Sequence, residues 1–252
     1  MDLNEQGRTG TPVQTRHFWE LARADFLMRL LRRRIGGGEG TLLDFGCGDG
    51  YLLRRMAAEL PRWRFRAVDA AFDAGTMREL ETAAPGRIRA ERALDAAILP
   101  EVSCVTLFDV LEHLEDDAGF LKMLAGGLPR GAELLITVPA GSRLYGEHDR
   151  RLRHFRRYDR IGLAAVLERS GVEVLECRSF FCSLYPVRLL EVLRGSAGGG
   201  IGGRSAGDSR HTARRGAGRK SAAAAVHVRV CQCAQRVPAC CLHSDGGRGT
   251  AH

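Results

Sequence analysis

The sequence predicts an α/β protein built on a doubly wound, mostly parallel β-sheet. Between residues 14 and 180, apolar runs of strand length alternate with segments of helical period. This alternation is typical of parallel strands joined by helical crossovers. Several apolar runs end in an aspartate, and a glycine-rich turn follows the first of them. Open sheets of this class bind ligands beyond the carboxyl ends of their strands, so the aspartates and the turn mark the expected site.

The first apolar run and its turn, residues 41–50, read TLLDFGCGDG. Leu42 and Leu43 are apolar on both strand faces, as expected of a buried parallel strand. Glycines at positions 46, 48 and 50 allow a sharp turn and a close approach of a ligand to the backbone. Residues 51–60 have helical spacing, so the turn opens onto free N–H groups at the start of a helix. This unit is predicted to bind a nucleotide.

Two classes of nucleotide cofactor use a strand, a glycine turn and a helix in this order. The dinucleotide fingerprint needs a glycine or alanine at its sixth position, where helix and strand pack closely. Counted from Gly46, that position is Tyr51. An NAD-dependent oxidoreductase is therefore the disfavoured alternative.

The other elements follow along the chain. A helix is predicted over 14–34, with apolar residues on one face and arginines on the other, which we expect to be solvated. The alternative is that residues 17–19 fold over the mouth of the cofactor site. Residues 180–193 are apolar and are predicted to pack as core, to close an acceptor pocket or to touch a membrane surface. The remaining strands are predicted at 64–69, 87–90, 102–109, 133–139 and 172–180. The remaining helices are predicted at 51–60, at 72–83, after residues 110–117 up to Leu128, and at 161–170 before Gly171.

A carboxylate follows the second predicted strand at the position where a ribose is expected. Asp69 lies 19 residues beyond Gly50, where the neighbouring parallel strand offers an acid to ribose hydroxyls in nucleotide-binding sheets. A carboxylate accepts hydrogen bonds from both the 2′ and the 3′ hydroxyl. Alone, such an aspartate is as often a helix cap. Together with the glycine turn it favours a binding role.

Five motifs occur in order over about 100 residues: LLDFGCGDG, AVDAAF, LDAAILP, DVLEHLEDD and LLITVPA. This series resembles the motif set of class I S-adenosylmethionine (SAM)-dependent methyltransferases that act on small molecules. The resemblance implies the Rossmann-like fold of that class, SAM as the cofactor and a small-molecule or a lipid- or sugar-linked methyl acceptor. The cofactor-binding residues that it implies are Asp44, Gly46 and Gly48 at the methionine part, Asp69 at the ribose, Asp95 with Ala96 at the adenine and Asp109 beside the sulfonium, together with Cys47, Gly50, Ala70 and Val110.

Methyl transfer to a hydroxyl or an amine needs a group that removes a proton. His113 follows the fourth strand, beside Glu112 and Asp109, and an ordinary imidazole with a pKa of about 6.5 suits a general base. The alternative is that His113 only shapes the loop. We retain His113 as a candidate catalytic residue.

A second candidate group follows the fifth strand, in the segments YGEHD (145–149) and HFRRY (154–158). They resemble a methyltransferase subgroup often associated with bacterial surface-sugar or lipid-linked substrates. The resemblance implies that His148 and His154 act as base or bind the acceptor, while Arg156 or Arg157 could clamp a carboxylate or phosphate. The alternative is a solvated charged loop. Two histidines and an acid could also chelate Mg²⁺ or Zn²⁺. Histidine-rich sites fit Mg²⁺ poorly, and no metal site is predicted.

Charge and composition restrict the partners of the predicted domain. The whole chain has a net charge of +8, which comes mostly from residues 195–252. These hold 9 basic and 2 acidic residues, whereas residues 1–194 hold 29 basic and 28 acidic residues. The basic balance is therefore no evidence that the domain binds nucleic acid. We find no signal-peptide pattern and no apolar run of about 18 residues, so we expect a cytoplasmic protein without a transmembrane segment.

The domain is predicted to span residues 14–194, after a disordered N-terminus at 1–13. From Gly195 onward, Gly, Ala, Arg, Ser and Cys dominate, and the antiparallel seventh strand usual for the class is not recognisable. Its only candidate is residues 225–230, whose apolar and polar residues alternate. We interpret 195–252 as a low-complexity tail created by a shifted reading frame in GC-rich DNA. The competing interpretation is a disordered basic tail that binds nucleic acid, and a SAM-binding but inactive product is the corresponding functional alternative.

Overall fold

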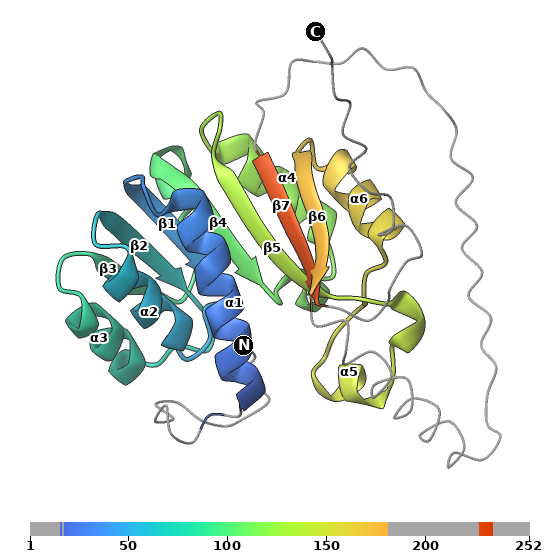
Figure 1. Cartoon of the computed structure of the whole chain (residues 1–252), viewed down its shortest axis with the longest axis horizontal. Helices are drawn as coiled ribbons and strands as arrows, with labels where there is room; N and C mark the ends of the chain where they lie inside the picture. The colour runs from blue at the N-terminus through green and yellow to red at the C-terminus, as the bar shows by residue number, and fades with distance from the viewer. Residues whose placement is uncertain (1–15, 17, 181–226, 234–252) are drawn as a thin grey trace, which may run out of the picture.

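The computed structural model describes residues 16, 18–180 and 227–233. These residues form one seven-stranded sheet in the order β3-β2-β1-β4-β5-β7-β6 (Figure 1). All six pairings between neighbouring strands are parallel. The predicted doubly wound α/β fold is confirmed. The strands are β1 (Gly40–Phe45), β2 (Trp63–Val68), β3 (Ile88–Glu91), β4 (Val102–Phe108), β5 (Glu133–Pro139), β6 (Glu173–Phe180) and β7 (His227–Cys233).

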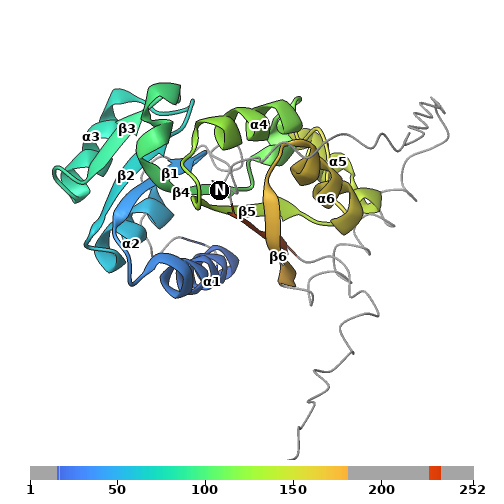
Figure 2. The same ribbon diagram turned by 90° about the horizontal axis from the view of Figure 1, so that it is seen from above.

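Helices cover both faces of the sheet (Figure 2). One core contains side chains of the first three long helices, and the other contains side chains of α4 and α6. Among the described residues, no helix is long and apolar enough to cross a membrane. The helices are α1 (Phe18–Ile35), α2 (Tyr51–Glu59), α3 (Ala74–Ala83), η3 (Ala96–Glu101), η4 (Leu111–His113), α4 (Asp117–Gly127), η5 (Ser142–Leu144), α5 (Glu147–Arg151) and α6 (Arg160–Arg169).

The two cores follow directly from the alternation of side chains along central strands. In β1, Leu42 packs under the first three helices, and Leu43 packs on the opposite face with α4 and α6. In β4, Cys104 and Val105 divide in the same way. Successive side chains of a strand point to opposite faces, so a strand covered on both sides must be apolar at every position. The sheet is therefore anchored from both faces, and its carboxyl edge stays open for a site.

The seventh strand occupies the expected position but runs in an unexpected direction. Residues 227–233 overlap the predicted candidate at 225–230 and lie between β5 and β6. The strand is parallel to both neighbours, with Val230 opposite Ile136 and Cys177, whereas an antiparallel strand was expected. An antiparallel return can follow a tight turn, but a parallel one needs a connection of about a dozen residues or more. Residues 181–226 supply that length. Residues 1–13, residues 181–193 of the predicted segment 180–193, and the rest of the tail lie outside the described residues.

Candidate active site

The predicted cofactor residues lie at the carboxyl edge of the sheet. Asp44 belongs to the end of β1, and the glycine turn joins it to α2. Asp69 and Ala70 follow β2, and Asp95 caps η3, which begins at Ala96. Asp109 and Val110 follow β4. The topology thus brings four separate sequence motifs to one edge, as the strand order predicts.

The glycine turn is built on left-handed backbone that side chains rarely adopt. Gly46, Gly48 and Gly50 have φ values of 72°, 62° and 70°. A Cβ on Gly46 would lie 2.6 Å from Cγ2 of Val110, and one on Gly50 would lie 2.3 Å from Cδ2 of Leu80. A side chain at either position would be strained by the left-handed backbone and would have to displace Val110 or Leu80, which is why glycine suits this turn.

We expect the Gly50→Ala substitution to destabilise the protein by about 2–4 kcal/mol, from left-handed strain and from overlap with the buried Leu80. Gly86 offers a matched control, because its φ is 73° and a Cβ there would meet nothing within 4 Å. Gly86→Ala should cost only the strain, about 1–2 kcal/mol. Urea unfolding of both variants measures the difference, and equal losses would contradict the role of the Leu80 contact.

The Asp69 carboxylate ties the glycine turn to β2 and retains acceptor capacity. Its Oδ2 accepts a hydrogen bond from the Gly48 backbone N–H at 2.8 Å, and its Oδ1 accepts one from the Ala71 N–H at 2.9 Å. An ionised carboxylate offers about four lone-pair sites, so two remain for ribose hydroxyls. Asp95 is exposed and accepts the N–H of Ala97 at 2.9 Å, which accounts for it as a helix cap.

Asp44 and Cys47 form the buried floor of the turn. The Asp44 carboxylate accepts a hydrogen bond from the Thr106 hydroxyl at 2.6 Å. Burial raises the pKa of Asp44 to about 6, although this hydrogen bond opposes the rise. Burial also raises the pKa of the Cys47 thiol well above its usual range, so that the thiol stays protonated at neutral pH.

Two arginines enter the site: Arg16, which precedes α1, and Arg23 of α1. The sequence-based expectation was that the arginines of this segment are solvated. Arg16 pairs with Asp49, and Arg23 pairs with Asp109 at 2.6 Å. Arg16 and Arg23 are 8% and 9% exposed. Burial has the largest single effect and raises the pKa of Asp109, but the Arg23 charge, the hydrogen bond from Thr137 and weaker charge effects together lower the pKa below its ordinary value. No local sequence signal distinguishes Arg16 and Arg23 from the other arginines of residues 14–34, because their partners Asp49 and Asp109 lie far along the chain.

A hollow opens between α1 and the glycine turn. Its lining combines Glu20 and Arg23 of α1 with Asp44, Gly46 and Tyr51 of the turn. A concave space with backbone N–H groups, a guanidinium and carboxylates fits the amino-acid end of SAM, which carries an ammonium and a carboxylate. The residues present therefore fit the cofactor that the motifs imply.

The segment 154–158 docks on the loop that follows β4. The Phe155 N–H donates to the Glu112 carbonyl at 2.7 Å, and the Tyr158 hydroxyl donates to the Leu111 carbonyl at 3.1 Å. Tyr158 also contacts the Asp117 carboxylate at 2.7 Å. These bonds join two segments about 40 residues apart and bring His154 to His113.

A buried carboxylate orients His154. Asp149 is fully buried, and its Oδ1 lies 3.1 Å from Nδ1 of His154 and 2.6 Å from Nε of Arg157. Burial alone would raise the pKa of Asp149, but the bond to His154 and the charge of Arg157 lower it below its ordinary range. A proton on Nδ1 directed at Asp149 leaves Nε2 as the acceptor nitrogen of a neutral ring.

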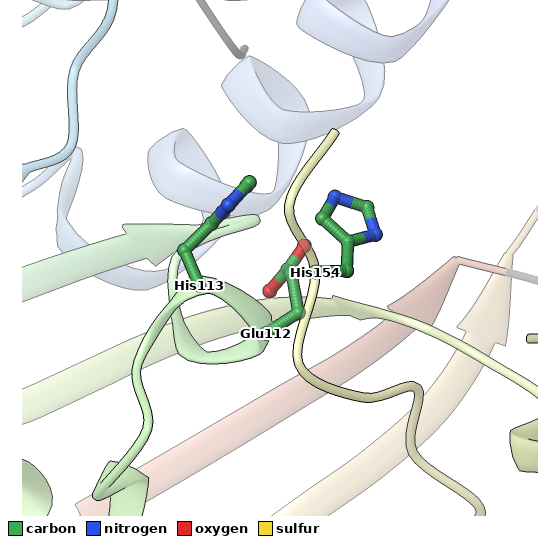
Figure 3. Close-up of side chains that lie close together, drawn as sticks. All are labelled: Glu112, His113 and His154. Carbon is green, nitrogen blue, oxygen red and sulfur yellow. The ribbon is translucent and has the colours of Figure 1, made fainter. Parts of the chain in front are cut away.

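Three side chains converge beside this pair (Figure 3). The rings of His113 and His154 meet edge to face, with centroids 4.6 Å apart. The Glu112 carboxylate lies between them in the close-up, and it is 1% exposed. Backbone strain flanks the cluster, because the non-glycine residues with positive φ in the described part of the chain are Asp109 and Arg153. Such strain tends to gather at functional sites.

The other candidate residues of this region lie outside the cluster or pair with acidic side chains. His148 is exposed in α5 and does not join the cluster of Glu112, His113 and His154. The proposed arginine clamp is not free for a ligand, because Arg157 pairs with Asp149 and Arg156 with Asp117 at 2.9 Å. Both arginines therefore bind the 145–158 region to the sheet edge.

Comparisons with known proteins bear on this site. A methyltransferase-domain profile matches residues 15–177. An O-methyltransferase family protein from Burkholderia thailandensis has 20% identity, a TM-score of 0.45 and coverage of 60% of this chain and 54% of its own. CalO1, a methyltransferase of calicheamicin biosynthesis bound to SAH, has 19% identity and a TM-score of 0.45. The match covers 61% of this chain and 49% of CalO1. NcsB1 of neocarzinostatin biosynthesis, an O-methyltransferase bound to SAM and 2-hydroxy-5-methyl naphthoic acid, has 20% identity and a TM-score of 0.44. The match covers 68% of this chain and 61% of NcsB1.

The match to these structures is partial, and the chain spans about half the length of the first two. No curated protein matches the sequence. The family profile carries the assignment, since it covers well over half of the 252 residues and contains all five motifs. The chain belongs to the methyltransferase-domain family, and as its motifs predict it is a class I methyltransferase whose cofactor is SAM.

Proposed function

We propose that this protein transfers the methyl group of SAM to a hydroxyl of a small-molecule or a lipid- or sugar-linked acceptor. The observation that carries the proposal is the Asp149–His154 pair, at 3.1 Å, beside His113 and beyond the same sheet edge as the glycine turn. An imidazole held by a carboxylate at one nitrogen presents the other nitrogen as a base. An alcohol or phenol acceptor requires such a base.

The cofactor is proposed to lie along the carboxyl edge from β2 to β4. Asp69 would accept the ribose hydroxyls, Asp95 and Ala96 would border the adenine, and the hollow beside α1 would hold the amino-acid end. The Asp109 carboxylate, kept ionised by Arg23, would face the positive sulfonium. Opposite charges at close range in a partly buried site favour this orientation.

The transfer itself needs alignment more than covalent help. When bound, SAM would supply its methyl group to the acceptor oxygen in line with the sulfur, and the electron pair of the broken carbon–sulfur bond would remain on sulfur. The hydroxyl proton passes to Nε2 of His154, and Asp149 stabilises the resulting imidazolium. Asp149 thus acts as a positioning residue, while His154 and His113 face the acceptor.

One observation favours a second candidate, a protein that binds SAM without transferring its methyl group. The β7 strand runs parallel to β5 and β6, where an antiparallel strand is usual for the class. The acceptor side of the site borders this part of the sheet. SAM binding without product formation from any acceptor would favour this candidate.

Calorimetry with SAM, followed by transfer of a labelled methyl group to a panel of phenols, hydroxylated lipids and sugars, tests the proposal. We expect Asp69→Asn to weaken SAM binding about 10- to 100-fold, because hydrogen bonds to a charged carboxylate are lost. Glu91→Gln, at the end of β3, is the matched control and should bind SAM normally. Binding of 2′-deoxy-SAM should be equally weak in the parent and in Asp69→Asn, and an unchanged affinity of Asp69→Asn for SAM would contradict the ribose contact.

A further inference from the structure

We propose that Glu112, His113 and His154 bind a divalent transition-metal ion beside the cofactor site. Each residue offers one ligand atom, and these atoms all lie within 4.8 Å of one another. Two imidazole nitrogens and one carboxylate oxygen form a donor set that suits zinc, cobalt or ferrous iron. The inference rests on the proposed function for the acceptor hydroxyl, but it changes the destination of the proton. An ion at Nε2 of His154 would bind the hydroxyl oxygen at an open coordination position and lower its pKa, so that the proton would leave to water and not to the imidazole.

The Glu112 carboxyl is buried, and burial together with the Asp109 charge raises its pKa well above the usual range, so that a binding cation would displace its proton. Its neighbours Asp109 and Asp149 are paired with Arg23 and Arg157. Within the described part of the chain, Glu112 has no ion pair, and its Oε2 is buried without a hydrogen-bond partner. Buried carboxylates are normally paired or bound to a metal. A bound cation would satisfy this oxygen.

The histidines are held as metal ligands usually are. Asp149 accepts from Nδ1 of His154, so Nε2 is the nitrogen left for an ion. A carboxylate that orients a ligating histidine from its far side is the common outer partner in metal sites. The second ligand, His113, lies edge-on to His154 and shares a one-turn helix with Glu112. Two of the three ligands are thus fixed by one short element and the third by a buried carboxylate.

The spacing requires a small closure around the ion. Bond lengths of 2.0–2.2 Å place tetrahedral ligand atoms about 3.4 Å apart. The ligand atoms would therefore approach one another by up to about 1.4 Å, which rotation about side-chain bonds supplies. The sequence-based expectation of no metal considered the segments 145–149 and 154–158 alone. It did not include Glu112 and His113, which the fold adds.

Titration of the chelator-treated full chain with Co²⁺, followed by visible absorption, tests the site. We expect one ion with nitrogen and oxygen ligands, and an affinity at least about tenfold lower in Glu112→Gln. Glu115→Gln, an exposed change three residues away, is the matched control and should bind Co²⁺ as the parent does. His113→Gln is the second variant if Glu112→Gln fails to fold, as judged by circular dichroism.

The chain carries four cysteines after residue 230, and their thiolates would give an intense charge-transfer band that the proposed site lacks. Equal affinity in the parent, Glu112→Gln and His113→Gln, or Co²⁺ bound through thiolates alone, would overturn the inference. SAM calorimetry and methyl transfer with chelator present separate the two proposals. Unimpaired transfer without Co²⁺ binding would sink the metal site and leave the proposed function standing. Co²⁺ binding at these residues without transfer to any acceptor would support the metal site and contradict the proposed function.

Discussion

Replacement of Asp149 by alanine is expected to destabilise the protein by about 3–5 kcal/mol, the usual cost of removing one partner of a buried ion pair. The Asp149 side chain is fully buried and contacts Arg157 at 2.6 Å and the Gly146 N–H at 2.9 Å. Without the carboxylate, the guanidinium of Arg157, itself 8% exposed, stays buried without its counter-charge. Urea unfolding monitored by circular dichroism measures the loss.

The charge of Asp149 also predicts a pH dependence. The pKa of Asp149 in the folded protein is lowered below the ordinary value of about 3.9. The contribution of Asp149 to folding stability is therefore fully present above that value and is lost as the pH falls through the folded pKa. The stability gap between the parent and Asp149→Asn should therefore be constant above about pH 5 and shrink below about pH 4. Glu147→Gln, an exposed change in the same helix, should show no comparable gap. A gap that persists unchanged into acid would contradict the ion-pair account.

The fold was predictable because local pattern and burial agree along the sheet. Leu42 and Leu43 are apolar on both faces because helices cover both faces, and the same holds for β4 and β5. Asp69 follows from the glycine turn by a fixed spacing. These features depend on contacts within one strand–helix unit or on the general strand order, so a single sequence contains them.

The acceptor side was only partly predictable, because contacts between distant segments create it. His113 and His154 were each candidates, but their contact depends on Phe155 and Tyr158 binding the loop after β4. Arg156 and Arg157 look like ligand clamps in sequence, and only the fold shows that Asp117 and Asp149 bind them. An arginine that pairs internally and one that binds a phosphate have the same local pattern.

The same reasoning explains Arg23 and the direction of β7. Helical periodicity assigns an arginine to the polar face of α1, but it does not say that Asp109, 86 residues away, meets that face. Alternation identifies residues 227–233 as a strand without giving its direction, because a strand's side-chain period is the same in both orientations. Direction depends on the length and path of the connection.

The largest expected effect on activity comes from His154→Gln, which should lower kcat by about 10²- to 10⁴-fold, the usual contribution of a general base. Glutamine keeps a polar side chain of similar reach but cannot take up the acceptor proton or bind an ion as imidazole does. SAM affinity should change little, because the cofactor contacts argued above come from the turn and from β2 to β4. Steady-state kinetics with the best acceptor measures the split between kcat and KM.

Two comparisons make this result specific to the acceptor side. Arg151→Gln alters an exposed residue of α5 and should retain the parent kcat, which controls for disturbance of the 145–158 region. A base role further predicts that the acidic limb of the pH–rate profile disappears in His154→Gln, which a merely structural loss would not cause. The His148→Gln variant tests the other candidate for the general base. If His148→Gln removed the acidic limb and His154→Gln kept it, the exposed histidine would be the base, and the Asp149–His154 pair would serve only to hold the loop.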